Sequence, residues 1–277
     1  MTDDPLKRGT PPGSLRHFAV MYAPARGRAV IEALYAYEAE IDETVQTSNH
    51  EVAHTRLHWW RTEIDRLRNG QPQHPITRAL LPLRAIAGDE LQLLHEPLVA
   101  ADIDLARMVL QNPQELEAYC LRSSGSLQTL AAIASSEPRP VSTRERVFAR
   151  GLGSCIRRTE ILRDLRRDLG HGRLRLPLEV LEAAGIDPGS LRAETWNAPL
   201  SRMLDDVREA LRREIDALPA ELDRDERRTQ RQGLVLAALH QRLLANIAHR
   251  TELARTRAEV SPWSKLWTAW RAAMRAA

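Results

Sequence analysis

Residues 160–177 have the sequence EILRDLRRDLGHGRLRLP. Asp164 and Asp168 are four residues apart, and Glu160 precedes them by the same interval. On a helix these three carboxylates project from one face, about one turn apart. Mg²⁺ prefers oxygen ligands and commonly bridges one or two carboxylates to the phosphates of a substrate. The spacing therefore predicts a helix whose acidic face can hold a divalent metal.

The same spacing also fits an exposed helix that is stabilised by ion pairs between neighbouring turns. The arginines at suitable spacing from the two aspartates are Arg163, Arg166, Arg167 and Arg173. From the spacing alone, a metal site and a solvated ion-pair helix both remain open.

Further motifs occur upstream in a fixed order. They are Arg28 with Ala33-Leu34-Tyr35-Ala36-Tyr37, then Leu57-His58-Trp59-Trp60-Arg61, Tyr119-Cys120 and Ser124-Gly125. Together with residues 161–177, this order resembles the squalene and phytoene synthase family over about residues 14–219. The resemblance implies an all-α isoprenoid (terpenoid) synthase fold, a single helical bundle around a central cavity.

The resemblance also implies a site. In that family two aspartate-rich helices face each other across the cavity, hold Mg²⁺ and bind the diphosphates of two isoprenoid substrates that are joined head to head. The candidate catalytic residues are Asp42, Asp164 and Asp168, and the candidate metal ligands are Asp164, Asp168, Glu160, Asp42 and Glu38. The candidate substrate-binding residues are Arg28, Arg163, Arg173 and Tyr119. The apolar residues expected to shield an allylic cation are Leu127, Leu130 and Ala131.

The first aspartate-rich motif departs from the family pattern. Where the family has Asp-Asp, two residues and Asp, this chain has Asp42, Glu43 and Gln46. Glu38 and Asp42 form a shifted acidic pair at a spacing of four. Other departures from the pattern are Arg157 for Gln, Glu160 for Asn, Arg175 for an aromatic residue and Gln128 for Gly.

The segment Tyr37-Glu38-Ala39-Glu40-Ile41 resembles a branch of the family that is related to an assembly factor for the respiratory NADH dehydrogenase. That resemblance implies a non-catalytic helper in respiratory complex assembly, with a respiratory-complex subunit as partner. An enzyme that transfers prenyl groups and a scaffold without chemistry are therefore both open.

A third hypothesis comes from His50-Glu51-Val52-Ala53-His54, which satisfies the His-Glu-x-x-His pattern of zinc metalloproteases. The preceding Asn49 favours instead the start of an ordinary helix, with Glu51 in its first turn. We therefore treat a zinc protease as the remote alternative.

Composition favours a helical protein without choosing among these functions. The chain has 277 residues, of which 43% are hydrophobic and only 4% aromatic, which suits helices better than a β-sandwich. The formal net charge is +3, and the basic residues alternate with acidic ones, so we expect no nucleic-acid partner. No run approaches the roughly 18–20 apolar residues of a membrane span, and no signal peptide is recognisable, so we expect a cytoplasmic protein.

The expected organisation is a flexible lead at 1–13, one helical domain at 14–256 and a Trp-rich helix at 257–277. The expected helices are 14–22, 25–46, 51–69, 75–87, 89–110, 113–134, 143–170, 196–217 and 224–256. Gly170-His171-Gly172 is expected to end the acidic helix.

At the C-terminus, Trp263, Trp267 and Trp270 recur with helical spacing and share one face. A short basic helix of this kind can lie in a membrane interface. Residues 261–277 therefore either make peripheral membrane contact, at the inner face of the membrane, or pack against the body.

Overall fold

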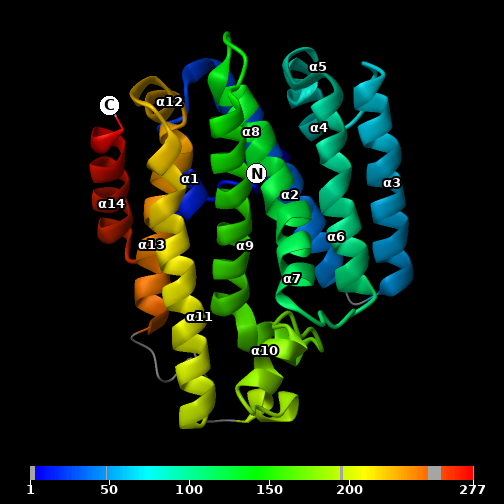
Figure 1. Cartoon of the computed structure of the whole chain (residues 1–277). Coiled ribbons are helices and arrows are strands. Elements are labelled where there is room, and N and C mark those ends of the chain that lie inside the picture. The colour runs from blue at the N-terminus through cyan, green and yellow to red at the C-terminus, as the bar shows by residue number, and fades with distance from the viewer. Residues whose placement is uncertain (1–3, 48, 194–195, 249–256, 277) are drawn as a thin grey trace.

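The computed structural model describes residues 4–47, 49–193, 196–248 and 257–276. Within these ranges the regular elements are helices and the chain has no β-strand (Figure 1). The predicted all-α class is confirmed.

The acidic sequence lies on α9 (Thr143–Gly170), which runs through the middle of the bundle (Figure 1). The helix begins with a capping box: Ser142 Oγ accepts from the Glu145 N–H, and the Glu145 carboxylate accepts from the Ser142 N–H at 2.8 Å. It ends at Gly170, and Gly172 has φ of 75°, which favours glycine. The predicted helix 143–170 is confirmed at both ends.

Four long helices pack around α9 or against its neighbours. They are α2 (Ala25–Gln46), α8 (Ser126–Ser136), α11 (Ala198–Ala217) and α13 (Arg231–Ala248). One continuous apolar core joins them, with fully buried Leu34, Leu130 and Leu243 among its members. This packing fixes α2 and α9 relative to each other.

The remaining helices complete the body. They are α1 (Leu15–Val20), α3 (His50–Arg68), α4 (Pro75–Ala79), α5 (Leu81–Ala87), α6 (Glu96–Leu105), α7 (Pro113–Cys120), α10 (Leu178–Ala183), α12 (Arg224–Thr229) and α14 (Pro262–Arg275). Short 3₁₀ helices lie at Pro5–Lys7, Gly88–His95, Pro188–Arg192 and Leu218–Glu221.

Four predicted helices are interrupted, and the one expected at 113–134 is divided by a π-helical turn at Leu121–Gly125. The helix expected at 75–87 is divided at Leu80, before Pro82, because proline cannot donate the next hydrogen bond. The helix expected at 89–110 starts as 3₁₀, continues as α6 from Glu96 and stops at Leu105. Arg107 then has φ of 50°, which a helix does not permit. The helix expected at 224–256 is divided at Gln230, and its part at 249–256 lies outside the described residues.

A π-helical turn at Leu121–Gly125 joins α7 to α8 and lies against α9. The contact is very close, since a Cβ added to Gly153 would lie 2.5 Å from Gly125 Cα. The turn also directs Ser124 toward α2, where its hydroxyl donates to Glu38 at 2.6 Å. Such turns are frequent at functional sites.

The N-terminal stretch expected to be a flexible lead is packed where it is described. Pro5–Lys7 form a 3₁₀ helix, and Arg8 bonds to Glu40 of α2 at 2.9 Å. Gly9 is buried against the backbone of Tyr35, where a Cβ would lie 2.0 Å from a carbonyl carbon. The absence of a side chain at this position lets the lead lie directly on α2.

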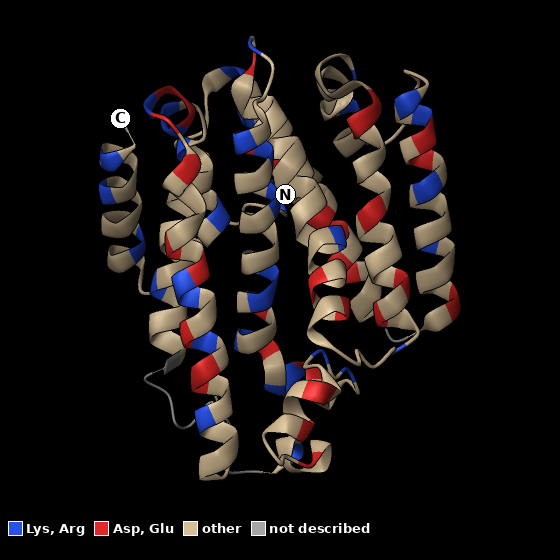
Figure 2. Ribbon diagram, in the orientation of Figure 1, with Lys and Arg blue, Asp and Glu red and all other residues tan. Residues whose placement is uncertain are grey.

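The outer helices α3 and α11 carry interspersed acidic and basic residues (Figure 2). At the edge of the bundle, α14 packs against α13 and buries Ala269 and Ala273, whereas Trp263 remains 81% exposed. Among the described residues, no helix is both long and apolar enough to cross a bilayer.

Candidate functional site

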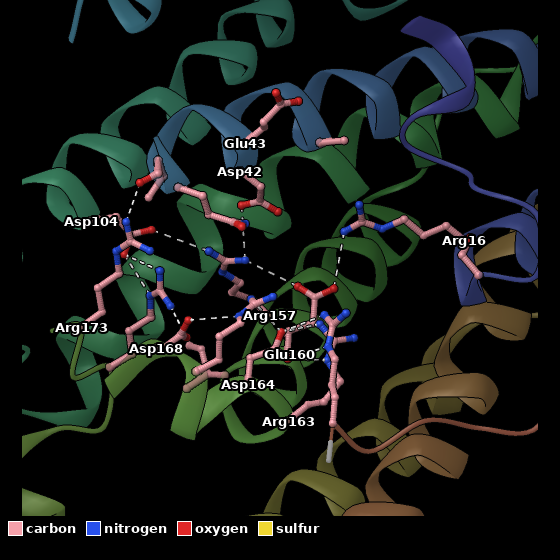
Figure 3. Close-up of a pocket in the computed structure, with 18 of the residues that line it drawn as sticks. Arg16, Asp42, Glu43, Asp104, Arg157, Glu160, Arg163, Asp164, Asp168 and Arg173 are labelled. Atoms are coloured by element: carbon pink, nitrogen blue, oxygen red, sulfur yellow. Dashed lines mark hydrogen bonds and ion pairs between the residues drawn. The ribbon is translucent and has the colours of Figure 1, made fainter. Parts of the chain in front are cut away.

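The acidic residues of α9 and α2 face each other across a pocket of about 450 Å³ (Figure 3). Glu160, Asp164 and Asp168 line one wall, and Asp42 with Glu43 lines the other. Both aspartates of α9 are nearly buried, with 6% and 5% of their surface exposed. The predicted arrangement of two acidic helices across a cavity is therefore present, although Gln46 leaves the α2 wall with less charge.

Arg157 lies between these walls (Figure 3). Its guanidinium is 3.6 Å from carboxylate oxygens of both Asp42 and Glu160, and 3.7 Å from Asp104 of α6. It also donates to the Tyr119 hydroxyl at 2.7 Å. One buried guanidinium thus contacts carboxylates from three helices.

Asp164 is held by three arginines, Arg163, Arg167 and Arg257, which we call the arginine triad. Arg163 and Arg257 each donate through Nε and Nη2 to both carboxylate oxygens, at 2.6–3.1 Å, and Arg167 adds a bond at 3.2 Å. Burial disfavours the carboxylate, but the hydrogen bonds from Arg163 and Arg257 lower the pKa of Asp164 to about 2. Asp164 is therefore negatively charged, and both of its carboxylate oxygens accept hydrogen bonds from arginines.

Asp168 and Asp104 share a fourth arginine. Arg175, on the segment after α9, donates to Asp104 at 2.9 Å and also donates to Asp168. Tyr119 donates to the other oxygen of Asp104 at 2.8 Å. These contacts tie α6, α9 and the following loop together around the pocket.

The N-terminal segment closes the pocket from the side of α2. Arg16 of α1 is 2.8 Å from Glu38 and 3.6 Å from Glu160. Burial raises the pKa of Glu38, while Arg16 and the Ser124 hydroxyl oppose that rise. The pKa of Glu160 is lowered, because Arg16 and Arg163 outweigh its burial.

His240 of α13 also lines the pocket and was not expected from the sequence. Its Nδ1 lies 2.8 Å from the Leu236 carbonyl oxygen, which fixes the ring as Nδ1–H donor when neutral. Burial lowers the pKa of His240 to about 4. A lone histidine within an amphipathic helix gives no sequence signal for this place.

Not all predicted residues meet at the pocket. Arg28 does not line it and donates instead to the carbonyls of Met21 and Ala23, closing the turn before α2. Arg173 lines the pocket and donates to the Val45 carbonyl. Tyr119 lies behind the pocket wall in a small cluster with Cys120.

Two further groups of residues singled out in the sequence lie elsewhere. Leu127, Leu130 and Ala131 are buried in the main core and do not line the pocket, because α8 turns that face toward its neighbouring helices. In the protease motif, His50, Glu51 and His54 are exposed at the start of α3.

The donor set of the pocket does not fit a magnesium centre. Every carboxylate on the α9 wall, and Asp42 opposite, is within 3.9 Å of a guanidinium. Among the described residues no group of three or more His, Cys, Asp or Glu side chains is placed to hold a metal ion. Mg²⁺ requires oxygen ligands in near-octahedral order at about 2.0–2.1 Å. Here the oxygens of Asp164 and Asp168 accept hydrogen bonds from arginines, and those of Asp42 and Glu160 lie 3.6 Å from Arg157.

The family model for squalene/phytoene synthase matches residues 12–264. The chain belongs to this family. A phytoene synthase of Mycobacterium tuberculosis is 30% identical over 178 residues, which cover 61% of this chain and 55% of that protein. A chloroplastic phytoene synthase of Daucus carota is 30% identical over 173 residues, covering 61% and 43%. The chain thus spans about half the length of these curated relatives.

Solved structures share the fold of this chain. A dehydrosqualene synthase in complex with a ligand superposes with a TM-score of 0.80 at 18% identity, covering 94% of this chain and 90% of that one. A squalene synthase of Alicyclobacillus acidocaldarius gives 0.73 at 18% identity, covering 89% and 92%. These likenesses confirm the predicted isoprenoid synthase fold.

Proposed function

We propose that this chain is a protein of isoprenoid biosynthesis that binds the diphosphate of an isoprenyl substrate in the pocket between α2 and α9. Family membership and fold support this proposal. The observation that carries it is the lining of the pocket: among the described lining residues, eight are arginines and six are aspartate or glutamate. Guanidinium groups bind phosphate oxygens in pairs, so an arginine excess suits a diphosphate.

Head-to-head prenyl transfer is the activity that we propose for the pocket. In such a reaction the allylic C–O bond breaks and its electron pair leaves with the diphosphate. The cation then alkylates the double bond of the second substrate, and the new cation loses a proton. The second diphosphate then leaves, and loss of a further proton gives a neutral hydrocarbon. Positively charged donors already in place stabilise the leaving group as its charge develops. Arg163 and Arg173, which line the pocket, would serve as such donors here.

A non-catalytic member of the family, with a helper role in respiratory complex assembly, is the second candidate. It is favoured by the shortage of apolar space beside the arginines. Leu127, Leu130 and Ala131 are enclosed in the core, and the small cavity beside Tyr119 has about 20 Å³, room for about one water molecule. A prenyl chain that binds here needs α2 or α6 to move.

Binding and chemistry are tested separately. Isothermal titration of farnesyl diphosphate, once in MgCl₂ and once in EDTA, is expected to give saturable binding, whereas farnesol, which lacks the diphosphate, is expected to bind far more weakly. Saturable binding in neither buffer would refute the proposed site. Extraction of reaction mixtures for a hydrocarbon of twice the substrate's carbon number then separates the enzyme from the helper.

We also propose that α14 makes peripheral membrane contact. Trp263, Trp267 and Trp270 are 81%, 58% and 46% exposed on one helix, with Arg271 and Arg275 beside them. Indole rings and basic side chains favour the headgroup region of an anionic bilayer. Co-sedimentation with vesicles of phosphatidylglycerol and phosphatidylcholine should fall when all three tryptophans are replaced by serine. Unchanged co-sedimentation would refute this contact.

A further inference from the structure

Arg157 places a positive charge among the acidic residues of the pocket. Arg157 precedes Glu160 by three residues and Asp164 by seven, so it shares the acidic face of α9. Its side chain is only 12% exposed and reaches Asp42, Asp104 and Glu160 at 3.6–3.7 Å. An arginine cannot lose its proton in a protein. The centre of the acidic group therefore already holds a permanent cation.

A divalent metal at this centre would have to displace that cation or lie beside it. Displacement would leave Arg157 buried without its counter-charges, which is costly. Coexistence would place like charges a few ångströms apart, beside a guanidinium that is only 12% exposed and so weakly screened by water. Both arrangements disfavour Mg²⁺ relative to a site whose carboxylates lack arginine partners.

Further along the acidic face, around Asp164, the arginine triad makes positive charge exceed negative charge. Arg163, Arg167 and Arg257 carry three positive charges against two negative ones, that of Asp164 and that of Asp168, which lies 3.9 Å from Arg167. Arg167 and Arg257 keep 46% and 48% of their side-chain surface exposed, so an incoming anion can reach them. Asp164 orients the three guanidiniums, and the net charge of this group favours a phosphate.

We infer that the pocket binds its diphosphate without a divalent metal, with Arg157 in place of the cation between the acidic helices and the arginine triad as the phosphate contact. This inference rests on the proposed binding of an isoprenyl diphosphate and names how that ligand is held. Asp164 then acts as a positioning residue for the triad.

The test is isothermal titration of the full chain with inorganic diphosphate and with farnesyl diphosphate, in EDTA and in MgCl₂. We expect saturable binding in EDTA with a Kd within about threefold of the value in MgCl₂. Arg163→Gln/Arg257→Gln should weaken binding in EDTA by about tenfold or more, the loss expected of a charge-assisted hydrogen bond. Arg122→Gln, which removes an Arg–Glu pair outside the pocket, should leave binding unchanged.

A second measurement tests Arg157 without the organic ligand. Electron paramagnetic resonance of Mn²⁺, a spectroscopic substitute for Mg²⁺, is expected to show no stoichiometric binding to the natural chain. Binding should appear in Arg157→Gln, which removes the cation that Asp42, Asp104 and Glu160 share. Arg157→Lys keeps the charge and should remain without Mn²⁺, and circular dichroism verifies that both variants are folded.

The outcomes separate this inference from the proposed function. Diphosphate binding that occurs only with Mg²⁺, or Mn²⁺ binding by the natural chain, overturns the inference and leaves the proposed function standing. Failure of Arg157→Gln to gain Mn²⁺ overturns the role of Arg157. Absence of binding in both buffers refutes the proposed function itself.

Discussion

Replacement of Asp164 by asparagine tests the arginine triad through stability. Asparagine has nearly the shape of aspartate but no charge, so Arg163, Arg167 and Arg257 would keep their places while losing their counter-ion. The side chain is 6% exposed, so solvent screens this interaction weakly. We expect Asp164→Asn to lower the free energy of unfolding at pH 7.

The magnitude follows from the pKa. The arginines hold the pKa of Asp164 at about 2, against an ordinary value of 3.8, and each pH unit corresponds to about 1.4 kcal/mol. The charged carboxylate therefore contributes about 2.5 kcal/mol at pH 7. Because the folded-state pKa is lowered, this contribution is present above the unfolded-state pKa and is lost as pH falls toward 2. At pH 3 it is about half as large.

Urea unfolding of both proteins, followed by circular dichroism from pH 7 to pH 3, measures this difference. Asp205→Asn is the matched control, because Asp205 is 60% exposed and pairs with Arg208 at 3.4 Å. Surface pairs of this kind contribute less than about 1 kcal/mol. A difference for Asp164→Asn that is below about 1 kcal/mol at pH 7, or that does not shrink with falling pH, would refute the reasoning.

Three further predictions concern the frame of the site. Gly153→Ala should destabilise the fold by about 1–3 kcal/mol, because its Cβ would meet Gly125 at 2.5 Å. Gly170→Ala, with open space around it, should change the melting temperature little; equal melting of the two variants would contradict the close contact. His240 should remain neutral down to about pH 4, so NMR should show no titration of its ring between pH 5 and 8. Because folding lowers this pKa, the unfolded chain takes up the proton first, so His240 reduces stability as the pH falls from about 6.5 to about 4. A ring that titrates near pH 6.5 in the folded protein would contradict the burial. Ser142→Ala should cost about 1 kcal/mol by removing the cap of α9, whereas an unchanged urea midpoint would show that the cap contributes nothing.

Much of the α9 wall could be predicted from local sequence. The capping box at Ser142 and the glycines after residue 169 fix the ends of the helix, and the interval of four places Glu160, Asp164 and Asp168 on one face. These features depend on neighbours within one or two turns. The same is true of α14, whose three tryptophans lie on a helix as the spacing predicts. That they are exposed and not packed against the body was left open by the sequence.

The partners of those carboxylates could not be predicted in the same way. Arg257 reaches Asp164 from 93 residues along the chain, and Arg175 bridges Asp168 to Asp104 across a loop. Such contacts depend on how helices pack, which the spacing of charges does not encode. Leu130 was expected to line a cavity but is buried in the main core. The sequence could not distinguish these places, because an apolar helix face can pack in a core or contact a substrate equally well.

The sharing of Arg157 among three carboxylates also constrains how the pocket can evolve. Loss of the arginine alone removes the cation that Asp42, Asp104 and Glu160 share. Loss of any one carboxylate weakens the electrostatic stabilisation of this buried cation. Neutral drift at one of these positions therefore changes which substitutions the others tolerate. We expect Arg157 and its acidic neighbours to be inherited as a set, so that descendants of this chain pass between arginine-filled and metal-binding pockets by coordinated replacement and not one residue at a time.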